Sequence, residues 1–353
     1  MQNATRKRSF LPKSIMVVTA LGLITVLGSY KAAATDVVTD PVGFITLTAY
    51  GTSGASGKSY LGLGMTQIPT NVGLVSAVSG LQATLSSPLP NGGFNKVGAN
   101  AAYFITVTTG SVAGVMSDIV SNNGTSVFTS EALPAASVGQ NYEIIPHWTI
   151  ASVFGPNDES GLQKGNASTA DLIQIFNPVT QAYAPYYYAV SSKTVTAGWK
   201  DSLGNDAAAT TMYIDQGFLI QKATTTNLTV KLVGAVKLGP TVIPLGANKN
   251  YVGNVYASGN MTLGTSMLYN GGNPTNSLVA GNASTADLVQ IYDSVAGSYS
   301  PYYYATSSKT VTAGWKNSLG GDATNVQIPL GRNILIQIIG GRTGFDWTPA
   351  APY

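Results

Sequence analysis

The chain has 353 residues, no cysteine and only 9% charged residues, against about 25% in ordinary soluble domains. The absence of cysteine excludes disulfides and thiolate metal sites. The hydrophobic content of 44% is too high for a disordered chain.

The N-terminus has the pattern of an export signal. Four cations come first, Arg6, Lys7, Arg8 and Lys13. The apolar run 15–28 follows, and Ala32-Ala33-Ala34 then offers a small-residue cleavage site before Thr35. We predict that residues 1–34 are a signal peptide and that the protein is exported, to the periplasm, the cell surface or the extracellular space.

The apolar run of 14 residues is short for a membrane span, which needs about 20, so we expect no span in the mature chain. A retained single-span anchor is the alternative.

Removal of residues 1–34 reverses the net charge. These residues hold five of the 18 basic residues and no acid, so the mature chain has 18 − 5 = 13 basic and 15 acidic residues, a net charge of −2. The basic character therefore belongs to the precursor. The mature part has no Lys/Arg cluster, and we expect no nucleic-acid partner.

The mature chain reads as a series of short β-strands that are rich in Val, Ile, Thr, Tyr and Phe and separated by turn residues. In chain order we predict strands at Val42–Ala49, Ala102–Thr108, Val127–Thr129, Tyr142–Pro146, Leu172–Phe176, Ala182–Ala189, Thr211–Ile214, Phe218–Gln221, Thr229–Leu232, Leu288–Tyr292, Tyr299–Ala305 and Asn333–Ile339. Asn123-Gly124 marks a hairpin turn. No long 3.6-residue apolar period is present. These features predict an all-β fold.

An internal duplication organises the chain. Residues 165–200 and 281–316 match at 27 of 36 positions without gaps, at an offset of 116 residues. The similarity extends weakly upstream, where the stretch from Tyr60 resembles that from Tyr251, and downstream, where the stretch from Gln216 resembles that from Gly331. Chance does not produce such a match, so this is a true tandem repeat.

The repeat predicts two related β-sandwich-like modules. The first module covers residues 35–222 and contains a β-rich insertion near 77–150. A connector, 223–240, leads to the second module, 241–339, and a Pro/Gly-rich tail, 340–353, ends the chain.

Several of these stretches resemble known families. Val42-Gly-Phe-Ile, Tyr142-Glu-Ile-Ile-Pro-His-Trp148-Thr and the run from Asp171 to Lys200 look like an uncharacterised exported β-repeat family abundant in Verrucomicrobia. Gly253-Asn254-Val255-Tyr256 and Gln290-Ile-Tyr-Asp293 are similar in part to extracellular β modules of Bacteroidetes-type bacteria. The resemblance implies export and a β fold, and it implies no particular activity.

Catalytic equipment is scarce in the sequence. His147 is the only histidine, and Glu143 lies four residues upstream, but no Gly-x-Ser-x-Gly elbow presents a nucleophile. We interpret His147 as a half-buried strand residue. Gly51 to Ser59 resembles a P-loop but has five residues between the glycines instead of four. We predict no catalytic residue, no enzyme activity and no cofactor.

Acidic residues recur at equivalent positions of the repeat, namely Asp171 and Asp287, and Asp206 and Asp322. A hydrolytic carboxylate pair and a calcium site are both alternatives. The favoured interpretation is that these residues accept backbone N–H bonds at turns, as Asx residues commonly do. We therefore predict no metal site.

Aromatic residues form the most informative constellation. Each repeat has a run of three tyrosines followed by a tryptophan. Strand alternation places the outer two tyrosines of each run on one face and the middle one on the other. Whichever face is outside would then expose phenol rings, which suit sugar rings or a protein partner. The candidate ligand-binding residues are Tyr186, Tyr188, Trp199, Tyr302, Tyr304 and Trp315. The alternative is cross-strand aromatic pairing, with each tryptophan buried in its module.

Low charge, tandem modules and absent thiols favour an exported structural or adhesive protein. The alternative is an extracellular glycan-binding protein that uses the duplicated Tyr/Trp strands, and a hydrolase is disfavoured by the single histidine and three glutamates. As partners we expect further copies of the chain, paired through edge strands, or an extracellular polysaccharide.

Overall fold

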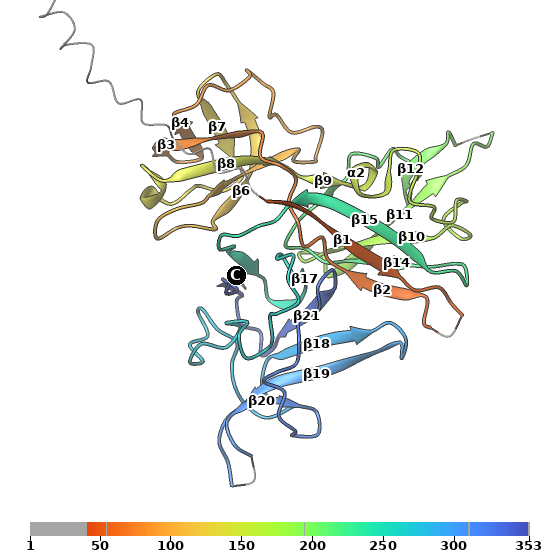
Figure 1. Ribbon diagram of the computed structural model, residues 1–353, viewed down its shortest axis with the longest axis vertical. Coiled ribbons are helices and arrows are strands. Elements are labelled where there is room, and N and C mark those ends of the chain that lie inside the picture. Colours follow the sequence, from red (N-terminus) through yellow and green to blue (C-terminus); the bar gives the residue numbers. More distant parts are fainter. Residues whose placement is uncertain (1–40, 54, 194, 310, 352–353) are drawn as a thin grey trace, which may run out of the picture. The chain divides into compact units, whose positions relative to one another are not determined.

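The computed structural model describes residues 41–351, apart from residues 54, 194 and 310. The predicted signal peptide, residues 1–34, lies outside the described residues. The described part is all-β, as predicted, and its strands form antiparallel sheets and a closed barrel (Figure 1). Within it the helices are short, α2 (Ile150–Phe154) and the 3-10 helix η1 (Ala135–Ser137). None of these helices is long and apolar enough to cross a membrane.

Several predicted strand boundaries are confirmed, among them those of β1 (Val42–Ala49), β11 (Ala182–Ala189) and β14 (Phe218–Gln221). The other strands are β2 (Lys58–Leu61), β3 (Asn71–Ser79), β4 (Gln82–Leu85), β5 (Tyr103–Val107), β6 (Met116–Asn122), β7 (Ser126–Thr129), β8 (Asn141–Pro146), β9 (Trp148–Thr149), β10 (Leu172–Asn177), β12 (Gly198–Asp201), β13 (Thr211–Met212), β15 (Leu228–Ala235), β16 (Ile243–Leu245), β17 (Asn248–Gly253), β18 (Leu288–Asp293), β19 (Ser298–Ala305), β20 (Gly314–Asn317), β21 (Asn333–Ile338) and β22 (Phe345–Trp347).

The duplicated sequence forms a duplicated sheet. One five-stranded sheet has the order β12-β11-β10-β14-β2, and the other, read from its corresponding edge, has the order β20-β19-β18-β21-β17. The registers agree residue for residue. Leu172 pairs with Gln221 in the first sheet, and their equivalents Leu288 and Gln337 pair in the second.

The two sheets meet in a pseudo-twofold junction. Leu61 of β2 bridges to Arg332, and Gln216 bridges to Val252 of β17. The sheet registers make Leu61 equivalent to Val252, and the 116-residue offset makes Gln216 equivalent to Arg332. Each bridge is therefore the image of the other, as in the interface of a symmetric dimer.

Aromatic rings from both repeats fill this junction. The first sheet contributes Tyr60, Phe176 and Tyr183, and the second contributes their equivalents Tyr251, Tyr292 and Tyr299. The Tyr60 ring lies 5.8 Å from that of Tyr251 and 5.4 Å from that of Tyr299, between ring centroids. Such aromatic packing stabilises contacts beyond the apolar area that it buries. We call these six residues the aromatic junction.

The insertion in the first module is a closed six-stranded barrel of order β3-β4-β7-β6-β5-β8. It spans Asn71–Pro146, where the sequence predicted an insertion near 77–150. Its core is separate from the main core and centres on the fully buried residues Val75, Ile105, Ile119, Val127 and Ile144. The hairpin predicted at Asn123-Gly124 joins β6 to β7.

A two-stranded ribbon, β1 with β15, packs on the main core. Its inner face is formed by Ile45, Leu47, Ala49, Leu228, Val230 and Leu232, all buried. Alternate residues point outward, as the period of a strand requires. β15 lies within residues 223–240, so this segment does more than connect the modules.

The end of the chain is also part of the fold. β22 pairs with β16, and Trp347 is buried, with its Nε1 donating to the carbonyl oxygen of Ser266 at 2.7 Å. The predicted tail, 340–353, therefore includes a docked strand. Its prolines follow Trp347, where no further ladder bond is needed.

Candidate functional site

Strand alternation orients the three tyrosines of each repeat as predicted. Tyr186 and Tyr188 face the main core, whereas Tyr187 faces the other way and packs against Ala170 and Ala189. The second repeat shows the same arrangement, with Tyr303 packed against Ala286 and Ala305. The expectation of an exposed ring face is wrong, because the segment before β10 folds back over the outer side of β11.

The two candidate tryptophans are core residues. Trp199 is 1% exposed and Trp315 is 4% exposed. Each meets a tyrosine edge to face, with ring centroids 5.2 Å apart for Tyr188–Trp199 and 5.7 Å apart for Tyr304–Trp315. These contacts are the cross-strand pairs of the alternative interpretation. Of the other candidates, Tyr188 is buried, whereas Tyr186, Tyr302 and Tyr304 are half-buried. Ligand binding by these six residues stays a prediction, and the burial of three of them does not favour it.

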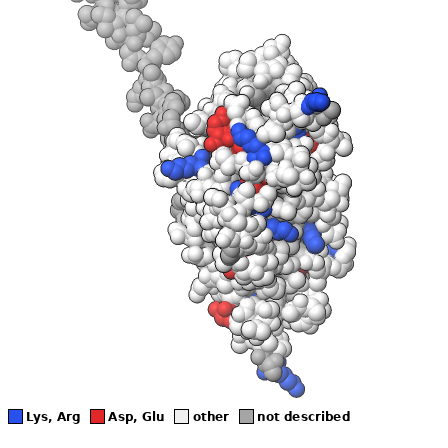
Figure 2. All heavy atoms as spheres, turned by 90° about the vertical axis from the view of Figure 1, so that its right-hand side faces the viewer, with Lys and Arg blue, Asp and Glu red and all other residues white. Residues whose placement is uncertain are grey.

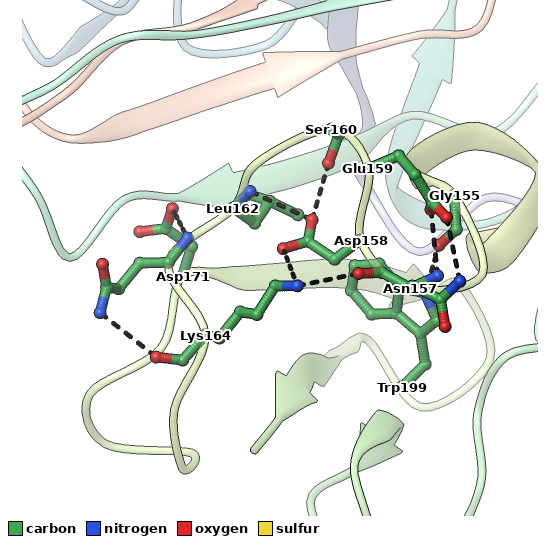
Figure 3. Close-up of polar contacts among 10 residues, drawn as sticks. Gly155, Asn157, Asp158, Glu159, Ser160, Leu162, Lys164, Asp171 and Trp199 are labelled. Atoms are coloured by element: carbon green, nitrogen blue, oxygen red, sulfur yellow. Dashed lines mark hydrogen bonds and ion pairs between the residues drawn. The ribbon is translucent and has the colours of Figure 1, made fainter.

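In the first repeat a polar loop lies over Trp199 (Figure 3), and its Lys164 contacts the Tyr188 ring. Asp158 Oδ1 accepts from the Ser160 hydroxyl at 2.9 Å and from the Leu162 backbone N–H at 3.1 Å. Lys164 Nζ lies 3.9 Å from Asp158 Oδ2 and 4.6 Å from the centroid of the Tyr188 ring. Burial raises the pKa of Asp158. The loop is thus tied down by its own hydrogen bonds, and Trp199 Nε1 donates to the Gly155 carbonyl oxygen beneath it at 2.8 Å.

The second repeat covers the equivalent position differently. Tyr269 stacks on Tyr304 with ring centroids 3.5 Å apart and an interplanar angle of 14°. The two repeats therefore form equivalent sheets but differ in the segments that cover them.

One pair of the duplicated acids, Asp171 and Asp287, accepts backbone N–H bonds, as the favoured interpretation predicted, whereas Asp322 accepts from the Thr324 hydroxyl. Asp171 accepts from the N–H groups of Gln163 and Ala223 at 2.8 and 2.7 Å. It also forms an ion pair with Lys222. In the part of the chain that the structure describes, no group of three or more His, Asp or Glu is placed to hold a metal ion.

A cleft of about 250 Å³ lies between the barrel and the segments that follow β13 and β15. It is lined by Phe104, Met116, Ser117, Asp118, Ser130, Glu131, His147, Tyr213, Ile214, Asp215, Val242 and Pro244. These residues come from three strands, β5, β6 and β16, and from four segments between strands. They are far apart in the sequence, and no local pattern connects them. The sequence singled out His147 alone among them.

Asp118 is the centre of this cleft. Its Oδ1 lies 2.9 Å from His147 Nε2, and its Oδ2 accepts from the Tyr213 hydroxyl at 3.0 Å. The His147 ring packs between Phe104 and Tyr213, with centroids 4.8 and 4.9 Å away. Burial first, and then the charge of Asp118, raises the pKa of Tyr213, so this phenol stays a neutral donor. Asp118, His147 and Tyr213 therefore each contact the other two.

His147 is buried rather than half-buried, at 6% exposure, and its carboxylate partner is Asp118 rather than Glu143. The nearby Ser117 hydroxyl donates to the Glu131 carbonyl oxygen at 2.9 Å. It is therefore committed to a backbone acceptor. The arrangement has the acid and imidazole of a catalytic triad but shows no hydroxyl activated by the imidazole among the described residues.

Comparison with protein-family models, curated proteins and solved structures gives no match. The resemblance to the Verrucomicrobia and Bacteroidetes-type proteins stays a prediction.

Proposed function

We propose that the protein is an exported, non-enzymatic structural or adhesive protein of the cell surface or extracellular space. It associates with further copies of itself through the outer face of the β1–β15 ribbon. The observation that carries this proposal is a cross-strand apolar pair on that face. Phe44 is 68% exposed and its partner Val233 is 62% exposed.

The exposed pair is part of a larger apolar patch. Val42, 61% exposed, lies two residues before Phe44 on the same face. These three residues, with Gly43 and Lys231, line a shallow hollow of about 400 Å³. Contiguous apolar surface of this kind on a water-facing sheet marks an interaction site.

A second copy suits this patch for two reasons. Within the described residues β15 is the only strand that pairs with β1, and an unpaired strand edge is a template for pairing with another chain. The low charge of the chain also offers little repulsion between copies. In Figure 2 the charged side chains are scattered and most of the visible face is uncharged.

Sedimentation velocity over a concentration series tests the proposal. A variant with Phe44→Thr and Val233→Thr places threonine, which is favoured in strands, at both positions and removes the apolar pair. We expect the native protein to form concentration-dependent assemblies and the double variant to sediment as a monomer. The matched control is Val179→Thr, an 89% exposed valine in the turn between β10 and β11, which leaves assembly unchanged. A native protein that is monomeric at every concentration, or a double variant that assembles normally, contradicts the proposal.

A further inference from the structure

The lysine, arginine and carboxyl content of the cleft around Asp118 is unbalanced, with carboxyl groups alone in its described lining. Three carboxyl groups line it, those of Asp118, Glu131 and Asp215, and no lysine or arginine is among the described residues that line it. The only nitrogen base in the wall is His147, whose Nε2 is already bonded to Asp118. A site with this lining favours a cation as its occupant.

The Asp118 carboxylate can accept further hydrogen bonds from a ligand. Its side chain is 27% exposed, so it reaches solvent although it is bonded to both His147 and Tyr213. Each carboxylate oxygen has two lone pairs, and these two bonds use one on each oxygen. The remaining acceptor capacity can therefore receive further N–H donors without any rearrangement, which is the condition for a preorganised site.

Asp215 adds a carboxyl group whose ionised form is disfavoured in the folded protein. Burial, together with the charge of Asp118, raises its pKa, so an empty cleft resists its ionisation. A bound cation would offset both effects. Tyr213 also lines the cleft, and aromatic rings attract cations over their faces.

We propose that this cleft binds a small organic cation that carries a primary ammonium group. The N–H donors of an ammonium can form charge-assisted hydrogen bonds with the carboxylates that line the cleft, first of all with Asp118, which keeps acceptor capacity. The volume of about 250 Å³ limits the buried part to a small ligand or to the end of a longer one. This proposal does not depend on self-association through the ribbon.

Titration calorimetry on the whole protein, with chemically matched probes, tests this inference. Glucosamine and cadaverine carry primary ammonium groups, whereas N-acetylglucosamine has the sugar ring of glucosamine with a neutral acetamide in place of the ammonium. We expect the two ammonium probes to bind, and N-acetylglucosamine to bind more weakly by about tenfold or more, which corresponds to at least about 1.4 kcal/mol. Raising the ionic strength should weaken the binding further.

Two variants and a control locate the site. Asp215→Asn removes a carboxylate from the wall, and Glu131→Gln removes one from an exposed position at the rim, where folding is not at risk. Each should weaken ammonium binding, Asp215→Asn by about tenfold. The control Asp206→Asn replaces an exposed acid outside the cleft and should leave the affinity unchanged. The inference is overturned if no ammonium probe binds at millimolar concentration, if the neutral sugar binds equally well, or if neither variant changes the affinity.

Discussion

Gly62 and Gly253 lie back to back at the junction of the two repeats. A Cβ atom on Gly62 would lie 2.7 Å from the Gly253 Cα, and a Cβ on Gly253 would lie 3.1 Å from the Gly62 Cα. The two residues are equivalent, since each follows the bridging residue of its own edge strand, Leu61 or Val252. The pseudo-twofold axis therefore passes between them, and the close approach of the two backbones requires glycine at both positions.

We predict that Gly62→Ala destabilises the protein by about 1–3 kcal/mol, the usual range for overpacking a close-packed interior. The added methyl group meets backbone on the opposite repeat, which cannot rotate away as a side chain can. Urea unfolding followed by circular dichroism measures the change. Gly253→Ala should act in the same direction and somewhat more weakly, because its closest approach is longer.

Gly259→Ala is the matched control, since a Cβ at Gly259 meets nothing within 4 Å. Its free energy of unfolding should stay within about 0.5 kcal/mol of the native value. If Gly62→Ala is as stable as this control, the close approach of the two repeats is not a structural requirement.

The sequence predicted the parts of the fold that depend on local pattern. The apolar and polar alternation of Val42–Ala49 and the repeated run around Tyr186 predicted correct strands. The repeat, which predicted two sandwich-like modules, forms two equivalent five-stranded sheets that share one core. It did not predict β3 and β4, where exposed Val72, Leu74 and Leu81 blur the alternation. Closure of the barrel depends on pairing β3 with β8, about 70 residues apart, and no local signal encodes such a contact.

The candidate site was less accessible to sequence reasoning for the same reason. Asp118 is on β6, and His147, which lies between β8 and β9, is 29 residues away in the sequence. Tyr213 is 95 residues from Asp118. Alternation correctly put Tyr186 and Tyr188 on one face, but it could not show that the loop with Lys164 covers Tyr188. Side-chain direction follows from the strand period, whereas coverage depends on tertiary packing.

The equivalent acids Asp171 and Asp287 should differ in their contribution to stability. Asp171 pairs with Lys222, whose side chain is 3% exposed, whereas Asp287 pairs with Arg342, whose side chain is 23% exposed. Asp171→Asn leaves an uncompensated buried ammonium, and we expect a loss of about 3–5 kcal/mol. Asp287→Asn leaves a guanidinium that can reach water, so its loss should be smaller.

Parallel urea titrations of the two variants measure this difference. Asp206→Asn, an exposed acid of the same repeat, serves as the control and should change the free energy of unfolding by less than about 0.5 kcal/mol. Equal losses for Asp171→Asn and Asp287→Asn would show that the burial of the cation does not determine the loss in free energy of unfolding.

The aromatic junction should make the protein sensitive to alkali. Burial raises the pKa of Tyr183 and Tyr299 above the ordinary value of 10.0. The folded state therefore holds these protons more tightly than the unfolded state. Their contribution to stability is complete below about pH 10 and is lost as the pH rises toward the folded-state pKa values.

We expect alkaline unfolding to coincide with a steep rise in tyrosinate absorbance, because these phenols ionise only when the junction opens. A variant with Tyr183→Phe and Tyr299→Phe should lose less stability per pH step above about pH 10. Tyr302→Phe, outside the six-ring junction, should follow the native curve. Gradual ionisation without unfolding would contradict a closed junction.

Asp215 should impose a stability cost that grows with pH. Its folded-state pKa is raised above 3.8 by burial and by the charge of Asp118, although the charge of His147 acts in the opposite direction. The folded state then binds this proton more tightly than the unfolded state. The resulting contribution to stability is fully present below about pH 3.8 and is lost as the pH rises through the folded-state pKa.

Asp215→Asn removes this dependence, so the variant should gain stability relative to the native protein as the pH increases from about 4 to 7. Thermal unfolding midpoints across that range measure the gain, with Asp206→Asn as the control that keeps the native profile. Parallel pH profiles for the native protein and Asp215→Asn would show that Asp215 ionises in the fold without cost. If Asp215→Asn is more stable than the native protein and also binds ammonium more weakly, Asp215 lowers the stability of the fold and contributes to ligand binding. Such a trade-off between stability and function is common at functional sites.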